Sequence, residues 1–169
     1  ALGVDAKNVG IIYNAGEANS RTLVTLAKEA SKSLGINILE ATVTNSSGVL
    51  LAAKSLVGKV EGIYIPTDNT VISALESVLQ VTYENKIPLI TGDTDSVVRG
   101  SLASLGMDYY KLGLQTGEIV YKIIKGANPA DTPVETLKDL ELFVNLKTAE
   151  RIGLNLPDEV IKKAAKVIK

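Results

Sequence analysis

The chain has 169 residues, 46% of them hydrophobic and 22% charged, with 18 lysine and arginine residues against 19 aspartate and glutamate residues. This is the length of one domain with a sizeable core, and the net charge of −1 lacks the basic excess that nucleic-acid binding needs. With neither cysteine nor histidine, disulfides, thiolate metal sites, imidazole triads and the commonest zinc sites are excluded, so we expect no metal and no cofactor.

The first predicted unit is a strand followed by a helix and a second strand. Residues 9–13 and 36–43 are β-branched runs typical of buried strands. Asn19 or Ser20 is expected to cap the helix between them, and Gly35 to end it. Helical spacing predicts that its buried face consists of Leu23, Leu26, Ala27 and Ala30.

The same alternation continues to residue 91. Ser46 or Ser47 is expected to cap a helix over residues 49–56, and a third helix is expected over residues 70–85. Further strands are expected at residues 62–65, stopped by Pro66, and at residues 88–91. Fourfold alternation with short joints indicates a doubly wound α/β fold, in which a parallel sheet carries helices on both faces. Continuously apolar strands agree with this fold class.

The second half of the sequence is less regular. Residues 101–107 are expected as a fifth strand, and residues 109–125 as a long helix that ends at Gly126. The remaining segments are expected to be a connector over residues 126–140, a strand over residues 141–145, and closing helices over residues 148–152 and 157–168. We therefore divide the chain into a core α/β lobe, residues 1–107, and a second region, residues 108–169, with the crossover helix, connector, late strand and closing helices.

Three polar loops follow the first, third and fourth predicted strands. Ligands of open parallel sheets bind where such loops leave the carboxyl ends of the strands. These loops bring Glu17, Asp68, Asp93 and Asp95 to one rim. Helix capping alone explains any one loop, but four carboxylates on one rim exceed what capping needs. A cation, an ammonium group or hydroxyl donors should lie among them, because unscreened like charges repel.

Three other chemistries fit the loops less well. A phosphate loop needs a glycine cluster and a lysine, whereas residues 14–17 place an acid there. A response-regulator receiver needs an acidic pair after the first strand and a later lysine, and only Asp68 fits that pattern. Asp93 and Asp95 could act as acid and base in glycoside cleavage, but no other residue supports that reaction.

Several segments together resemble one known family. They are YNAGEANS at residues 13–20, PTDNTV at 66–71 and DTDSV at 93–97, with further likeness at residues 106–113 and 144–149. The chain resembles the substrate-binding proteins of ABC transporters with a type I periplasmic-binding fold, in the branch of tryptophan- and phenylalanine-binding lipoproteins. Family members have two lobes, and this chain is similar to the carboxy-terminal half only, a flavodoxin-like lobe.

The resemblance implies a non-enzymatic binding lobe. In the family, a small amino acid is captured for import between two lobes, and an aromatic amino acid is the ligand favoured here. The closed form of the two-lobed protein docks on a membrane permease. By this resemblance, Asp68, Asp93 and Asp95 are expected to accept hydrogen bonds from the ligand ammonium. Backbone donors at the helix N-termini near Asn19, Ser20 and Asn69 are expected to meet the ligand carboxylate. Tyr13 is expected either to form a wall of the site or to be a core residue. The predicted ligand-binding residues are Tyr13, Asn14, Glu17, Asn19, Ser20, Thr67, Asp68, Asn69, Asp93, Thr94 and Asp95.

Location and assembly follow from the same resemblance. The first five residues lack the features of a signal peptide, so we expect either a cytoplasmic protein or one whose signal has been removed. The family implies an extracytoplasmic protein, lipid-anchored when full-length, and the alternative is a cytoplasmic ligand-sensing domain of a transcriptional regulator. A homodimer is predicted because the helix over residues 109–125 has apolar residues that need a partner surface, namely Leu112, Ile119, Val120 and Ile123.

Overall fold

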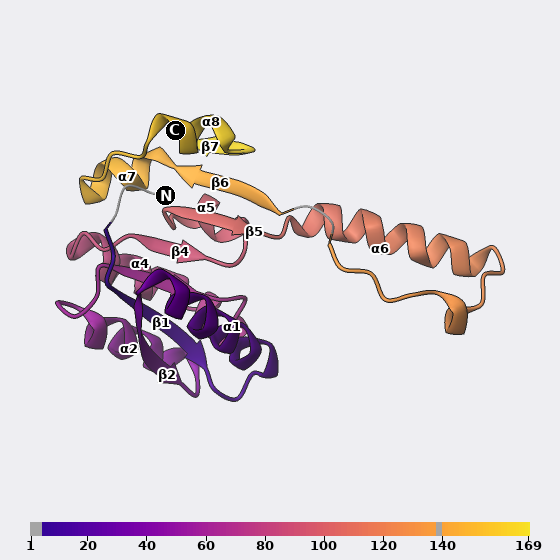
Figure 1. Ribbon diagram of the computed structural model, residues 1–169, viewed down its shortest axis with the longest axis horizontal. Helices are drawn as coiled ribbons and strands as arrows, with labels where there is room; N and C mark the ends of the chain where they lie inside the picture. The colour runs from indigo at the N-terminus through magenta and orange to yellow at the C-terminus, as the bar shows by residue number, and fades with distance from the viewer. Residues whose placement is uncertain (1–4, 138–139) are drawn as a thin grey trace.

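The computed structural model describes residues 5–137 and 140–169 (Figure 1). Within these residues, seven strands form one sheet in the order β2-β1-β3-β4-β5-β6-β7. The strands are β1 (Asn8–Asn14), β2 (Asn37–Val43), β3 (Gly62–Ile65), β4 (Leu89–Thr91), β5 (Ala103–Gly106), β6 (Glu141–Asn145) and β7 (Lys166–Ile168). The helices are α1 (Ala18–Leu34), α2 (Val49–Leu56), α3 (Asn69–Ile72), α4 (Leu75–Glu84), α5 (Asp95–Arg99), α6 (Tyr109–Ile124), α7 (Leu146–Ile152) and α8 (Asp158–Lys163), with 3-10 turns at Ser46–Gly48 and Pro129–Asp131.

The predicted doubly wound α/β fold is confirmed. Strands β2, β1, β3, β4 and β5 pair in parallel. On one face of the sheet, Ile11 packs with Val24 of α1. On the other face, Ile12 and Ile63 pack in a cluster with residues of α2 and α4. Burying both faces explains why the central strands β1, β3 and β4 are largely apolar.

Strand β6 differs in direction, because it pairs antiparallel with β5. The chain leaves the sheet after Gly106, runs out along α6, and returns through the connector to Glu141, which lies opposite Gly106 in register (Figure 1). A chain that leaves and re-enters at the same edge must run back along the strand it left. Lys111 of α6 forms an ion pair with Glu141 at the base of this excursion.

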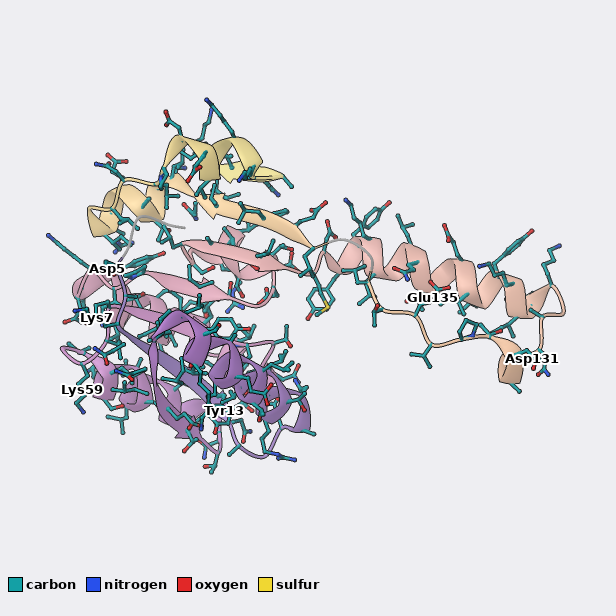
Figure 2. All side chains as sticks on the ribbon, in the orientation of Figure 1. Asp5, Lys7, Tyr13, Lys59, Asp131 and Glu135 are labelled. Atoms are coloured by element: carbon teal, nitrogen blue, oxygen red, sulfur yellow. The ribbon has the colours of Figure 1, made fainter. Side chains whose placement is uncertain are left out.

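Helix α6 projects away from the sheet, and Asp131 and Glu135 lie on the connector that runs beside it (Figure 2). No residue of α6 is buried. The exposed stripe differs from the predicted one, since Leu112, Ile119 and Ile123 are half-buried. The large exposed apolar side chains of this helix are Tyr109, Tyr110, Leu114, Val120, Tyr121 and Ile124.

The predicted N-cap residues of α1 and α2 were wrong, although α2 spans residues 49–56 as predicted. Helix α1 begins at Ala18, after the N-cap residue Glu17, so Asn19 and Ser20 lie in its first turn and do not cap it. The cap residue of α2 is Gly48, without a side-chain hydrogen bond. Gly35 does end α1, with a left-handed φ of 66° that favours glycine.

The predicted buried face of α1 was also partly wrong. Leu26 is 55% exposed and Ala30 is exposed. The buried residues of this helix are instead Ser20, Val24 and Ser31. Ser20 is polar yet buried, and its hydroxyl donates to Asp68 in the loop after β3.

Three further elements depart from the predictions. The helix expected over residues 70–85 is broken at Ala74, giving α3 and α4. Helix α5 forms within a stretch expected to be a loop. The last expected helix ends at Lys163, because the following residues extend and β7 pairs with β6.

Candidate functional site

Loops at the carboxyl edge of the sheet enclose an open cleft of about 650 Å³. As predicted, the loops that follow β1, β3 and β4 meet at this edge. The cleft is lined by Asn19, Thr67, Asp68, Asn69, Ile72, Ser73, Asp93, Asp95, Arg99 and Tyr109. Six of these were predicted as ligand-binding residues: Asn19, Thr67, Asp68, Asn69, Asp93 and Asp95.

Asp68 joins the connection between β1 and α1 to the start of α3 at the cleft. Its side chain is 1% exposed. One carboxylate oxygen accepts from the Asn14 N–H at 2.7 Å and from the Ser20 hydroxyl at 2.6 Å, and the other accepts from the Val71 N–H at 2.8 Å. A buried carboxylate that accepts three hydrogen bonds is well compensated for its lost hydration. Asp68 therefore caps α3 and holds it against the start of α1.

Glu17 makes a second bridge between the same loops. Its carboxylate accepts from the backbone N–H and side-chain amide of Asn69, both at 2.9 Å, and from the N–H (3.0 Å) and hydroxyl (2.7 Å) of Thr70. Desolvation raises the pKa of Glu17, but these hydrogen bonds outweigh it, so its pKa lies below the usual value of 4.5. The carboxylate is thus occupied within the protein.

Asp108 is the N-cap residue of α6, and Asp93 accepts hydrogen bonds from the first turn of α5. The buried Asp93 carboxylate accepts from the N–H and the hydroxyl of Ser96, both at 2.8 Å. Asp108 accepts from the N–H groups of Tyr110 at 2.8 Å and Lys111 at 3.2 Å. The capping explanation therefore accounts for most of the carboxylates around the cleft.

Asp95 is different from these carboxylates. Its side chain is exposed at the cleft, and it makes no hydrogen bond or ion pair with the described part of the chain. Arg99, the cationic residue of the cleft lining, is engaged elsewhere. Its guanidinium donates to both oxygens of Glu76 at 2.9 Å and to the Ile72 carbonyl at 3.0 Å. Asp95 is thus the lining carboxylate whose oxygens remain open to solvent.

Tyr109 completes the cleft from the start of α6. Desolvation raises the pKa of its phenol, and the negative charges of Asp93 and Asp95 raise it further. The sequence reasoning missed Tyr109, together with Ile72, Ser73 and Arg99. Tyr109 could have been found, because it follows the fifth strand at the same carboxyl edge.

Tyr13 does not line the cleft. It is buried against α1, in the compact part of the molecule (Figure 2), and its hydroxyl donates to Glu40 at 2.7 Å. That hydrogen bond, burial and the charge of Glu40 raise the pKa of Tyr13 to about 12. Tyr13 is therefore a core residue, and the expectation that it could form a wall of the site is corrected.

The other predicted residues outside the lining hold the loops in place. Asn14 donates its side-chain amide to the Thr70 hydroxyl at 2.9 Å and accepts from the Gly16 N–H at 2.8 Å. Thr94 donates to the Met107 carbonyl at 3.1 Å. With Glu17 and Ser20, these residues position the cleft rather than line it.

A family profile described as ABC transporter substrate binding protein matches residues 3–168. The chain belongs to this family. The ABC transporter substrate-binding proteins are binding proteins and not enzymes, and membership implies an extracytoplasmic protein. Among the described residues, no helix has the length and apolar character needed to cross a membrane.

Individual relatives agree with the family. The chain is 38% identical over 149 residues to the tyrosine-binding protein of Clostridioides difficile, covering 88% of this chain and 43% of that protein. An ABC domain from Streptococcus pneumoniae, solved in complex with L-Trp, is 32% identical with a TM-score of 0.92 over 99% of this chain and 57% of that one. The ligand-free, open structure of a Clostridium difficile substrate-binding protein with adhesive properties is 36% identical, with a TM-score of 0.77 over 98% of this chain and 55% of that one. The chain thus spans about half the length of these relatives.

Proposed function

We propose that this chain is the carboxy-terminal lobe of a solute-binding protein that captures an aromatic amino acid for import. The observation that carries the proposal is the cleft at the carboxyl edge of the sheet, in a lobe that aligns along 99% of its length with a relative solved with L-Trp. The name of the tyrosine-binding relative supports the same ligand class. Family membership favours transport over a cytoplasmic sensing domain.

The cleft offers both apolar and polar surface to such a ligand. Ile72 and the half-exposed ring of Tyr109 provide apolar area for an aromatic side chain. Asn19 is held toward the floor, because its amide donates to the Thr67 carbonyl at 2.6 Å. The open cleft covers one side of a ligand, and a second lobe closing over it would exclude water and strengthen the polar contacts.

Calorimetry on the full-length, two-lobed protein tests this proposal. We expect tryptophan, tyrosine or phenylalanine to bind, and leucine, glutamate and lysine to bind far more weakly. Ser73→Trp should abolish binding by filling the cleft. Ser33→Trp is a matched control, because both serines are exposed and donate to a backbone carbonyl three residues earlier in the chain. Binding that survives Ser73→Trp, or a preference for a non-aromatic ligand, would contradict the proposal.

We also propose that the exposed stripe of α6 is covered in the assembled protein. Tyr110, Leu114, Gly117, Tyr121 and Ile124 recur every three or four residues, which places them on one face of the helix. A Cβ added at Gly117 would meet no atom within 4 Å, so nothing in the described chain requires glycine there. Glycine inside a helix costs about 1 kcal/mol relative to alanine, and a closely approaching neighbour would explain it. In a full-length protein this neighbour is the other lobe, and in the isolated chain it is a second copy. Docking on a permease remains part of the proposed function.

A further inference from the structure

We infer that Asn145 and Thr148, two buried residues outside the cleft, are positioning residues for ligand binding. They hold α5, and with it the part of the cleft lining that α5 provides. The inference rests on the proposed function, because it concerns how the same cleft keeps its shape. It is carried by the hydrogen bonds that join the junction of β6 and α7 to the end of α5.

Helix α5 depends on tertiary contacts for its place beside the cleft, to which it contributes Asp95 and Arg99. Isolated helices shorter than roughly 12–15 residues are marginal in water, and α5 has five residues. Its first turn is fixed to the preceding loop, where Asp93 accepts from the N–H and the hydroxyl of Ser96. The direction of α5 across the cleft therefore depends on what holds its last turn.

The last turn of α5 is held by side chains from other elements. The last backbone carbonyl groups of a helix have no partners within it. Asn145 donates from its side-chain amide to the Val97 carbonyl at 2.9 Å, and the Thr148 hydroxyl donates to the Gly100 carbonyl at 2.8 Å. Both donor residues are 5% exposed, and each lies 48 residues from its acceptor. The Gly100 carbonyl also accepts from the Tyr83 hydroxyl at 2.8 Å, so the end of α5 is held between α4 and α7.

The residue type at position 145 distinguishes this role from ordinary capping. Asn145 is the N-cap residue of α7, and its Oδ1 accepts from the Thr148 N–H at 3.0 Å. Aspartate and serine cap helices about as well as asparagine, so capping alone does not require an amide. The amide adds a donor, and that donor is used on the Val97 carbonyl. Because an N–H can only donate and a carbonyl can only accept, the orientation of the amide is fixed, and one side chain joins the start of α7 to the end of α5.

Both positioning residues act on the cleft through α5. Neither is among the described residues that line the cleft, whereas Asp95 and Arg99 of α5 are. Arg99 also connects α5 to its neighbours, since its guanidinium donates to the Ile72 carbonyl and to the Glu76 carboxylate. A shift of α5 would therefore move two lining residues together and disturb the contacts of Arg99 with α3 and α4.

Calorimetry on the full-length protein tests the inference, with tryptophan, tyrosine and phenylalanine as probes. Thr148→Val removes the hydroxyl donor and keeps the shape of the side chain, and Asn145→Asp keeps the cap acceptor and removes the amide donor. Each should weaken binding of the probe that the wild type binds best by about threefold to tenfold, the factor expected for one lost hydrogen bond.

Thr82→Val is the matched control. Thr82 is also buried, and its hydroxyl donates to the Leu79 carbonyl within α4 at 3.0 Å. The substitution removes the same kind of hydrogen bond with the same change of shape, so it should lower stability by a similar amount. It should leave affinity within about twofold, because it leaves the hydrogen bonds that hold α5 intact.

Hydrogen exchange separates positioning of α5 from a general loss of stability. Thr148→Val should speed amide exchange at residues 96–101 relative to the amides of α4, whereas Thr82→Val should do the reverse. Wild-type affinity or wild-type exchange at α5 in Thr148→Val, or equal weakening of binding by Thr82→Val, overturns the inference while the proposed function stands. If Asn145→Asp does not fold, Thr148→Val decides. If the wild type binds none of the three amino acids, the proposed function fails, and the exchange measurement alone decides whether these residues hold α5.

Discussion

Replacing Asp68 tests whether the floor of the cleft is held by a buried, fully used carboxylate. Asp68→Ala removes the acceptor for three donors, namely the N–H groups of Asn14 and Val71 and the Ser20 hydroxyl. Each buried donor left without a partner costs about 1–3 kcal/mol, so the free energy of unfolding should fall by on the order of 3–9 kcal/mol. That is a large share of the roughly 5–15 kcal/mol that stabilises a typical domain.

Asp68→Asn is the finer version of this test. Asparagine keeps one acceptor oxygen, which can serve the Val71 N–H and still cap α3. Its amide then faces the Asn14 N–H, a donor against a donor, so about 1–3 kcal/mol should be lost. The ordering expected from the geometry is therefore wild type, then asparagine, then alanine.

Urea unfolding followed by circular dichroism measures these differences. Asp95→Asn is the matched control, because it removes the same charge from the same cleft without removing a hydrogen bond, and should change stability by less than about 0.5 kcal/mol. If Asp68→Asn and Asp95→Asn were equally mild, the three contacts of Asp68 would not be stabilising, and the reasoning would be refuted.

Three further predictions concern other parts of the molecule. The folded-state pKa of Glu17 is lowered from 4.5, so its contribution to stability is present above the unfolded-state pKa and is lost as pH falls through the folded-state pKa. Glu17→Gln should therefore flatten the pH dependence of the free energy of unfolding below about pH 4.5. An unchanged pH dependence in this acid range would contradict the prediction. The hydrogen bond to Glu40 and burial raise the pKa of Tyr13 to about 12, so its stabilisation is present below pH 10 and is lost as pH rises through about 12. Ultraviolet titration should show a tyrosine that ionises near pH 12, and this transition should disappear in Tyr13→Phe. Light scattering of the isolated chain should report a dimer at high micromolar concentration. Leu114→Glu should make the chain monomeric, whereas Glu118→Gln on the same helix should leave it dimeric. A monomeric wild type would count against the proposal that the exposed stripe of α6 is covered.

The sequence by itself determined the elements whose signals are local. The alternation of apolar runs and helical spacing predicted β1 to β4 and the helices between them, and Gly35 marked the end of α1 because a left-handed residue there favours glycine. The rule that ligands gather at the carboxyl edge of a parallel sheet also brought Asp68, Asp93 and Asp95 to one place. These conclusions depend on residues close together in the chain, or on topology that follows from them.

Only the tertiary structure decided what each polar residue does. Asp68 accepts hydrogen bonds from Asn14, 54 residues away, and from Ser20, 48 residues away. Asp95 has no such partner within residues 5–137 and 140–169, and nothing local in the sequence distinguishes the two side chains. Tyr13 turned into the core through Glu40, 27 residues away. Residues 166–168 became a strand because β6 offered an edge to pair with. In each case a hydrogen-bond partner distant in sequence outweighed the local preference, because burying a polar group without a partner costs more than any single-residue propensity provides.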